Sequence, residues 1–129
     1  MHRSRVGVVL IDHPAASYGA AATFWADATG HTRSGDDPSA EQPYESLQDL
    51  PGGVQVALQL LGEGTAPRVH LDIETDDVEA ETARVLALGA RLVEQREGYA
   101  ILADPGGVLF CVVPVQTGEA FETHATRWE

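Results

Sequence analysis

The chain of 129 residues contains no lysine, no asparagine and only one cysteine, Cys111. A single cysteine excludes an internal disulfide framework and suits a reducing compartment. Long apolar runs are also missing, because the first run, 6–11, ends at Asp12 and is too short for a secretory signal or a membrane span. We therefore expect a cytoplasmic protein.

Positive charge is scarce, since eight arginines face twenty acidic residues and the formal net charge is −12. This balance argues against nucleic acid and anionic membranes as partners, because both require basic patches. It permits a cationic or metal-bound ligand, although an acidic surface also simply keeps a protein soluble. Hydrophobic residues make up 43% of the chain, which is enough for the core of one domain spanning 1–129.

The first half alternates between strand and helix patterns. We predict strands over 5–12, 44–47 and 54–61, a helix over 17–29 that ends at Gly30, and a polar loop over 32–43. A spacing of i, i+3, i+4 and i+7 predicts the inward face of the helix. That face consists of Ala21, Phe24, Trp25 and Ala28.

The second half repeats the plan more clearly. Its first strand, from Arg68, places His70, Asp72 and Glu74 on one face and Val69, Leu71 and Ile73 on the other. Asp76, with Glu79 three residues later, predicts the start of a helix, and Gly89 its end. The predicted inward stripe of this helix is Val78, Thr82, Val85 and Leu86. The strands that follow are predicted at 91–96, 99–103 and 108–113.

An internal repeat predicts the fold. Repeat one covers about 5–62, repeat two about 67–115, and a polar tail follows at 116–129. A βαβββ unit has one sheet face covered by its helix, so that its other face must be buried by pairing with a second unit. We therefore predict an α+β fold in which two βαβββ modules form an incompletely closed eight-stranded barrel around a cleft.

Several short motifs, in order, carry a family resemblance. They are Phe24-Trp25 before Gly30, Leu58-Gln59, Val69-His70-Leu71-Asp72, Leu88-Gly89-Ala90 and the run 102–107. Over roughly 5–114 the chain resembles the vicinal oxygen chelate superfamily of glyoxalases, bleomycin-resistance proteins and extradiol dioxygenases, and above all its glyoxalase-like domain proteins. The resemblance implies a homodimer, because many members pair modules across subunits.

The resemblance also implies a metal set in the metal-dependent members, with inward ligands on the first and last strand of each half. Here the first strand offers only the valines and glycine of 6–9, and Cys111 stands where a glutamate is usual. His70 matches the family's ligand histidine, and Gln59 (or Gln55, in a shifted register) could be a second ligand. We therefore expect no cofactor; the alternative is a divalent metal ion held by His70 and Gln59.

Two functions follow from these residues, and whether the protein is an enzyme stays open. The first is binding of a small molecule between the modules without a catalytic metal, in a site formed by Tyr44, Gln59, His70, Tyr99 and Cys111. The second is a glyoxalase-type lyase or isomerase that uses His70 as its base or residual metal ligand. His70 could also be an idle structural histidine, and the tail with Phe121 and Trp128 could serve a structural subunit. The other histidines, His2 among them, are interpreted as surface residues.

Overall fold

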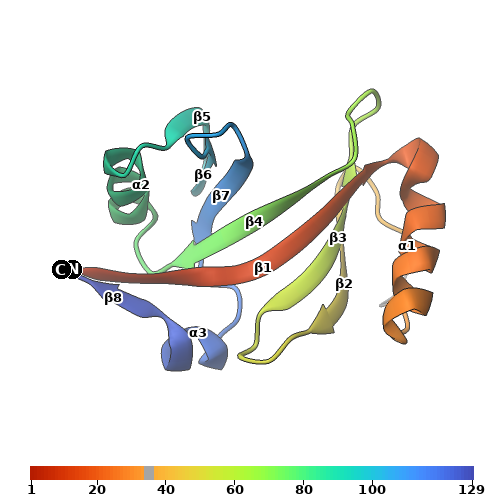
Figure 1. Ribbon diagram of the computed structural model, residues 1–129, viewed down its shortest axis with the longest axis horizontal. Helices are drawn as coiled ribbons and strands as arrows, with labels where there is room; N and C mark the ends of the chain where they lie inside the picture. The colour runs from red at the N-terminus through yellow and green to blue at the C-terminus, as the bar shows by residue number, and fades with distance from the viewer. Residues whose placement is uncertain (34–36) are drawn as a thin grey trace.

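The computed structural model describes residues 1–33 and 37–129, so Gly35 and Asp36 of the predicted loop lie outside the described part. Figure 1 shows the eleven elements in chain order. They are β1 (His2–Pro14), α1 (Ala15–Thr29), β2 (Tyr44–Asp49), β3 (Gln55–Leu61), β4 (Arg68–Thr75), α2 (Val78–Ala87), β5 (Arg91–Arg96), β6 (Tyr99–Ala103), β7 (Leu109–Pro114), α3 (Glu119–His124) and β8 (Thr126–Trp128). Among the helices of these residues, none has the length and apolar character to span a membrane.

One mixed sheet organises the molecule. Its strand order is β2-β3-β1-β4-β7-β6-β5, and β8 pairs with β1 as the eighth strand. The halves meet edge to edge through the antiparallel pair β1–β4, while β3 and β7 flank that pair in parallel. Because β2 and β5 remain unpaired edges of this order, hydrogen bonds do not close the sheet. The predicted α+β fold with an open eight-stranded sheet is confirmed.

The two halves differ in how they supply those eight strands. The second half provides three strands after its helix, as predicted, whereas the first provides two. Between Gly30 and Pro43, the described residues contain no strand. The eighth strand instead comes from the tail, where β8 runs antiparallel to the start of β1.

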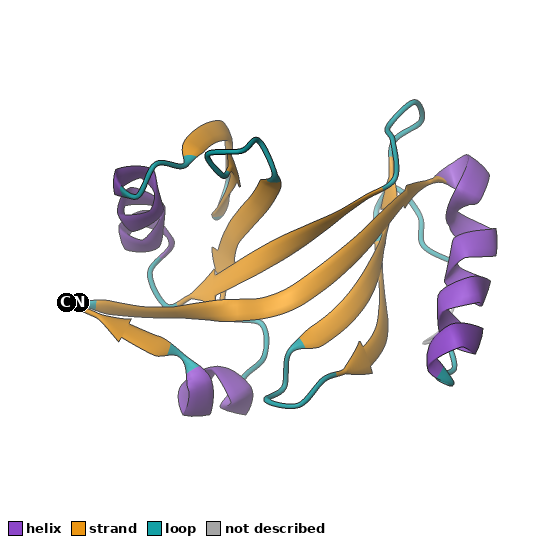
Figure 2. Ribbon diagram, in the orientation of Figure 1, coloured by secondary structure: helices purple, strands orange, loops and turns teal. Residues whose placement is uncertain are grey.

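The long helices lie at opposite ends of the sheet, each over the strands of its own half (Figure 2). Helix α1 buries Tyr18, Ala22 and Ala26, while Phe24 is exposed. The predicted inward face was therefore wrong for Phe24 and for Ala28, which is also exposed, because the helix is oriented by Tyr18. The Tyr18 hydroxyl donates a hydrogen bond of 2.8 Å to buried Glu45 on β2.

Helix α2 also differs from its prediction. Its N-cap is Asp77 rather than Asp76, and the Asp77 side chain accepts a hydrogen bond from the amide of Ala80. Asp76 instead pairs with Arg3 at 2.9 Å. The helix buries Val85, as predicted, but Leu86 is exposed.

The tail packs on the body of the protein. Phe121 of α3 is fully buried, and the Trp128 indole donates to the hydroxyl of Ser4 on β1 at 2.8 Å. The guanidinium of Arg84 lies 3.8 Å from the centre of the Trp128 ring. The tail therefore ties α2 to the first strand.

Candidate functional site

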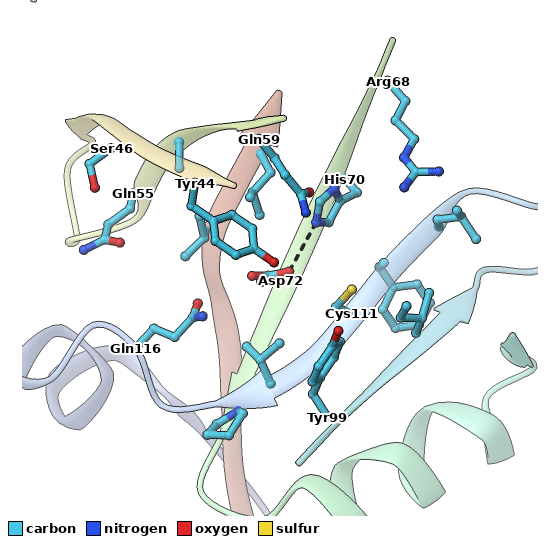
Figure 3. Close-up of a pocket in the computed structure, with 18 of the residues that line it drawn as sticks. Tyr44, Ser46, Gln55, Gln59, Arg68, His70, Asp72, Tyr99, Cys111 and Gln116 are labelled. Carbon is cyan, nitrogen blue, oxygen red and sulfur yellow. Dashed lines mark ion pairs between the residues drawn. The ribbon is translucent and has the colours of Figure 1, made fainter. Parts of the chain in front are cut away.

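A cleft of about 520 Å³ lies on the inner face of the sheet. All five predicted site residues line it: Tyr44, Gln59, His70, Tyr99 and Cys111. Figure 3 shows them converging from different strands, with the hydroxyls of Tyr44 and Tyr99 directed toward Asp72 and Cys111. The structure thus brings together residues that are up to 67 positions apart, while their roles stay a prediction.

Strand alternation and register explain this convergence. His70 and Asp72 share the inner face of β4, because alternate residues of a strand point the same way. Asp72 stands beside Cys111 of β7, and on the other flank Gln59 of β3 stands opposite Tyr44 of β2. The middle of the inner face is apolar, since Val8 and Leu10 of β1 line it there.

His70 lies between two carboxylates. Its Nδ1 donates a hydrogen bond of 2.5 Å to Oδ2 of Asp12, and its Nε2 lies 3.5 Å from Oδ1 of Asp72. Asp12 is fully buried, whereas His70 and Asp72 each keep 8% exposure. Hydrogen bonding to Asp12 fixes the ring orientation and leaves Nε2 facing the cleft.

These neighbours keep His70 protonated. Burial by itself lowers the pKa of His70, but the hydrogen bonds to Asp12 and Asp72, together with Cys111, outweigh it and raise the pKa from 6.5 to about 11. At neutral pH the side chain is therefore an imidazolium. It can donate a hydrogen bond or a proton, but it is not prepared to act as a general base.

Asp12 is the residue that sequence reasoning missed. It stands at the end of an apolar run and was interpreted as the end of the strand, yet β1 continues to Pro14. Its register partner on β3 is Gln59. Two buried oxygens on these neighbours, Oδ1 of Asp12 and Oε1 of Gln59, have no hydrogen-bond partner. Strand alternation could have indicated the position of Asp12, because Asp12 follows Val8 and Leu10 at intervals of two residues and so lies on the same inner face.

Positive and negative charges are nearly balanced around the cleft. Arg68 donates to Asp12 at 3.3 Å, so that Arg68 and His70 offset the charges of Asp12 and Asp72. At the edge of the cleft, buried Glu45 is paired with Arg33 at 3.0 Å. The excess negative charge of the whole chain is therefore not concentrated in the cleft.

Three residues could hold a metal ion. His70, Asp72 and Cys111 offer ligand atoms within 4.8 Å of one another. One nitrogen, one oxygen and one sulfur suit zinc and do not suit hard ions that prefer oxygen ligands. However, Nε2 of His70 would be the ligand atom, and this nitrogen already holds a proton against Asp72. A metal ion bound there would therefore compete with this proton for Nε2.

Two other buried carboxylates have structural partners. Glu74 is fully buried beside Arg5 and accepts hydrogen bonds from the amides of Gln116 and Thr117. Glu81 is fully buried on α2, 2.7 Å from a ring nitrogen of His2. The interpretation of His2 as a surface residue was wrong, because its side chain is only 9% exposed.

Comparison with solved structures supports the fold. A hypothetical protein of Bacillus halodurans aligns with a TM-score of 0.61 at 15% identity, over 88% of this chain and 95% of its own. Methylmalonyl-CoA epimerase from Mycobacterium tuberculosis gives a TM-score of 0.57 at 19% identity, over 89% and 91%. A Mn(II)-bound glyoxalase from Novosphingobium aromaticivorans gives 0.57 at 19%, over 90% of this chain and 43% of its own. At these identities the likeness concerns the fold alone.

Comparison of sequences identifies the family. No curated protein matches the chain. The family model described as "Glyoxalase-like domain" matches residues 8–113, which include all residues that line the cleft except Pro114 and Gln116. The chain therefore belongs to the glyoxalase-like domain family.

Proposed function

We propose that this protein binds a small molecule in its cleft and does so without a catalytic metal. The observation that carries the proposal is the cleft itself. Its volume of about 520 Å³ lies within the range of small-molecule sites, roughly 300–1,000 Å³. Apolar side chains such as Leu10 and Ile101 line it, and a few polar groups, led by His70, converge at one place. This combination supplies buried contact area together with a fixed orientation for a ligand.

Two features support binding without a metal. The central part of the inner face carries Val8, Leu10 and Ala57, which have no ligand atoms. His70 is already engaged by Asp12 and Asp72 at both ring nitrogens. A metal ion would have to displace the proton on Nε2, and the raised pKa of His70 opposes that displacement.

A second candidate is a glyoxalase-type lyase or isomerase. The position of His70 favours it, because an imidazolium facing a cleft can deliver a proton to a bound carbonyl compound. In that case His70 acts as an acid rather than as the base that the sequence suggested. Chromatographic detection of a product distinguishes this candidate from binding alone.

Ligand binding is tested by thermal shift against small carbonyl compounds and cationic antibiotics, followed by calorimetry on any hit. An Ala57→Phe variant fills the floor of the cleft, where Ala57 is 9% exposed. We expect the variant to lose the ligand response. Ala28→Phe adds the same side chain at an exposed site on α1 and should keep it. Equal responses from both variants would show that the ligand binds elsewhere.

The remaining expectations concern assembly and location. A homodimer follows only from the family resemblance, and light scattering coupled to size-exclusion chromatography measures it directly. The cytoplasmic location likewise stays a prediction.

A further inference from the structure

The buried carboxylates of the described residues differ in how well the protein satisfies them. Four of them accept two or more hydrogen bonds each: Asp12, Glu45, Glu74 and Glu81. Asp72 is the exception, because its closest polar contact is Nε2 of His70, 3.5 Å from Oδ1, at the outer limit of a hydrogen bond. In the described part of the chain, no donor contacts its second oxygen, Oδ2. Asp72 lines the cleft and is 8% exposed, so that a bound molecule can supply the missing donor.

The three tyrosines show the same contrast. Tyr18 donates its hydroxyl hydrogen to Glu45 at 2.8 Å. The hydroxyls of Tyr44 and Tyr99 have no hydrogen-bond partner among the described residues, and both side chains line the cleft. In Figure 3 they come from the two halves of the chain and are directed toward the part of the cleft that holds Asp72. Burial raises the pKa of Tyr44, and Tyr99 and Asp72 raise it further, which agrees with their closeness to its hydroxyl.

A ligand group that satisfies all three side chains needs an N–H donor next to a carbonyl acceptor. Oδ2 of Asp72 can accept from the N–H, and a carbonyl oxygen can accept from two hydroxyls because it has two lone pairs. In a lactam or a primary amide, the N–H and the C=O lie side by side on the same edge. A carboxylic acid does not fit in the same way, because it is ionised at neutral pH and repelled by Asp72.

We propose that the cleft recognises a neutral amide group, with Asp72 accepting from its N–H and with Tyr44 and Tyr99 donating to its carbonyl oxygen. The proposal rests on the proposed binding function, because it names the chemical class of the ligand for the same cleft. Recognition of this kind forms no covalent bond and transfers no proton. The apolar side chains of Leu10 and Ile101, which also line the cleft, suit a flat ring system that carries the amide.

Three small probes of similar shape separate the two kinds of contact. Carbostyril is a bicyclic lactam with its N–H beside the carbonyl. Coumarin has a ring oxygen in place of that N–H, and quinoline has no carbonyl. All three are neutral at pH 7, so that long-range attraction or repulsion by the acidic chain affects them equally. Ligand-observed NMR titration of the intact chain measures the dissociation constant of each probe.

We expect carbostyril to bind most tightly. A hydrogen bond to a charged group changes an affinity roughly ten- to hundredfold, so coumarin should bind at least about tenfold more weakly than carbostyril. Quinoline lacks both the N–H and the carbonyl and should bind most weakly.

Variants separate the roles of the three side chains. Asp72→Asn should reduce the preference for carbostyril over coumarin to about threefold or less, because a neutral amide accepts more weakly and can itself donate to coumarin. Tyr44→Phe and Tyr99→Phe should each weaken both probes by a similar factor of about two to ten, and so keep the preference. Asp27→Asn makes the same change as Asp72→Asn at an exposed position on α1 and should alter neither affinity. A merely structural role for Asp72 would change both affinities together.

Three outcomes would overturn the proposal. Coumarin could bind the unmodified protein as tightly as carbostyril, or carbostyril could fail to bind at millimolar concentration, and neither result needs a variant to fold. The third is a preference for carbostyril that survives Asp72→Asn. If other compounds still bind and Ala57→Phe abolishes their response, only the recognition of an amide is refuted, and the proposed binding function stands.

Discussion

Replacing Asp12 with asparagine should destabilise the protein in a pH-dependent way. Asp12 is fully buried and accepts hydrogen bonds from His70 at 2.5 Å and Arg68 at 3.3 Å. Asparagine has nearly the same size, so the change removes charge rather than volume. Breaking a buried ion pair by removing one partner costs about 3–5 kcal/mol. We expect the free energy of unfolding to fall by about 3 kcal/mol at pH 7, near the low end because asparagine still accepts a hydrogen bond.

The sign of the pH effect follows from His70. Its pKa is raised from 6.5 to about 11 in the folded protein, so the folded state holds the proton more tightly than the unfolded chain. The stability that this tighter proton binding contributes to the folded state is complete below pH 6.5 and is lost as the pH rises through about 11. For one proton, the free energy of unfolding falls by at most about 1.4 kcal/mol per pH unit, hence by up to about 2.7 kcal/mol between pH 7 and 9. Without Asp12 the slope should be smaller, so the stability difference between the two proteins should narrow with rising pH.

Urea unfolding at pH 6, 7, 8 and 9, with a chelator present, measures both quantities. The pH range from 6 to 9 suits this measurement because the chain has no lysine and its arginines stay charged throughout. Glu97→Gln removes an exposed charge and serves as the control. A difference between Asp12→Asn and the unmodified protein that stays constant from pH 6 to 9 would refute the protonated His70 on which the reasoning depends.

Three further predictions concern the metal, the centre of the sheet and the tail. Elemental analysis of protein purified without chelator should find no stoichiometric divalent ion; a tightly bound zinc would contradict the proposal of metal-independent binding. Gly7→Ala should destabilise the protein by about 1–3 kcal/mol in urea unfolding, because an added Cβ would lie 2.5 Å from Cδ of the anchored Glu74 side chain. Phe121→Ala should cost about 3–5 kcal/mol in the same measurement, since Phe121 is fully buried. An effect below about 1 kcal/mol there would mean that the tail is not part of the cooperative fold.

Features that depend on local periodicity could be predicted from the sequence. Alternation along one strand placed His70 and Asp72 together, and the doubled element order indicated the open sheet. Gln59 and Cys111 were selected through the family resemblance, which implies inward ligands on their two strands, and both residues line the cleft. These inferences need no knowledge of distant partners.

Features that depend on long-range register could not be predicted in this way. The pairing of Asp12 with His70 requires the antiparallel alignment of β1 with β4, which includes a register shift between Val6 and Val8. The inward face of α1 was misjudged for a related reason. Phe24 and Trp25 look like the obvious anchors in a helix rich in alanine, but the hydrogen bond from Tyr18 links the helix to Glu45, 27 positions further along the chain.

The charge of the cleft bears on which ligands suit it. A net charge of −12 suggested a cationic guest, yet Asp12 and Asp72 are offset locally by His70 and Arg68. Buried charges that are already paired offer little attraction to a new cation, because the ligand would have to compete with the existing partner at close range. A neutral molecule with a hydrogen-bond acceptor does not compete for these pairs and can accept from a tyrosine hydroxyl that lines the cleft. The local arrangement of charges therefore favours a neutral carbonyl compound over a cation.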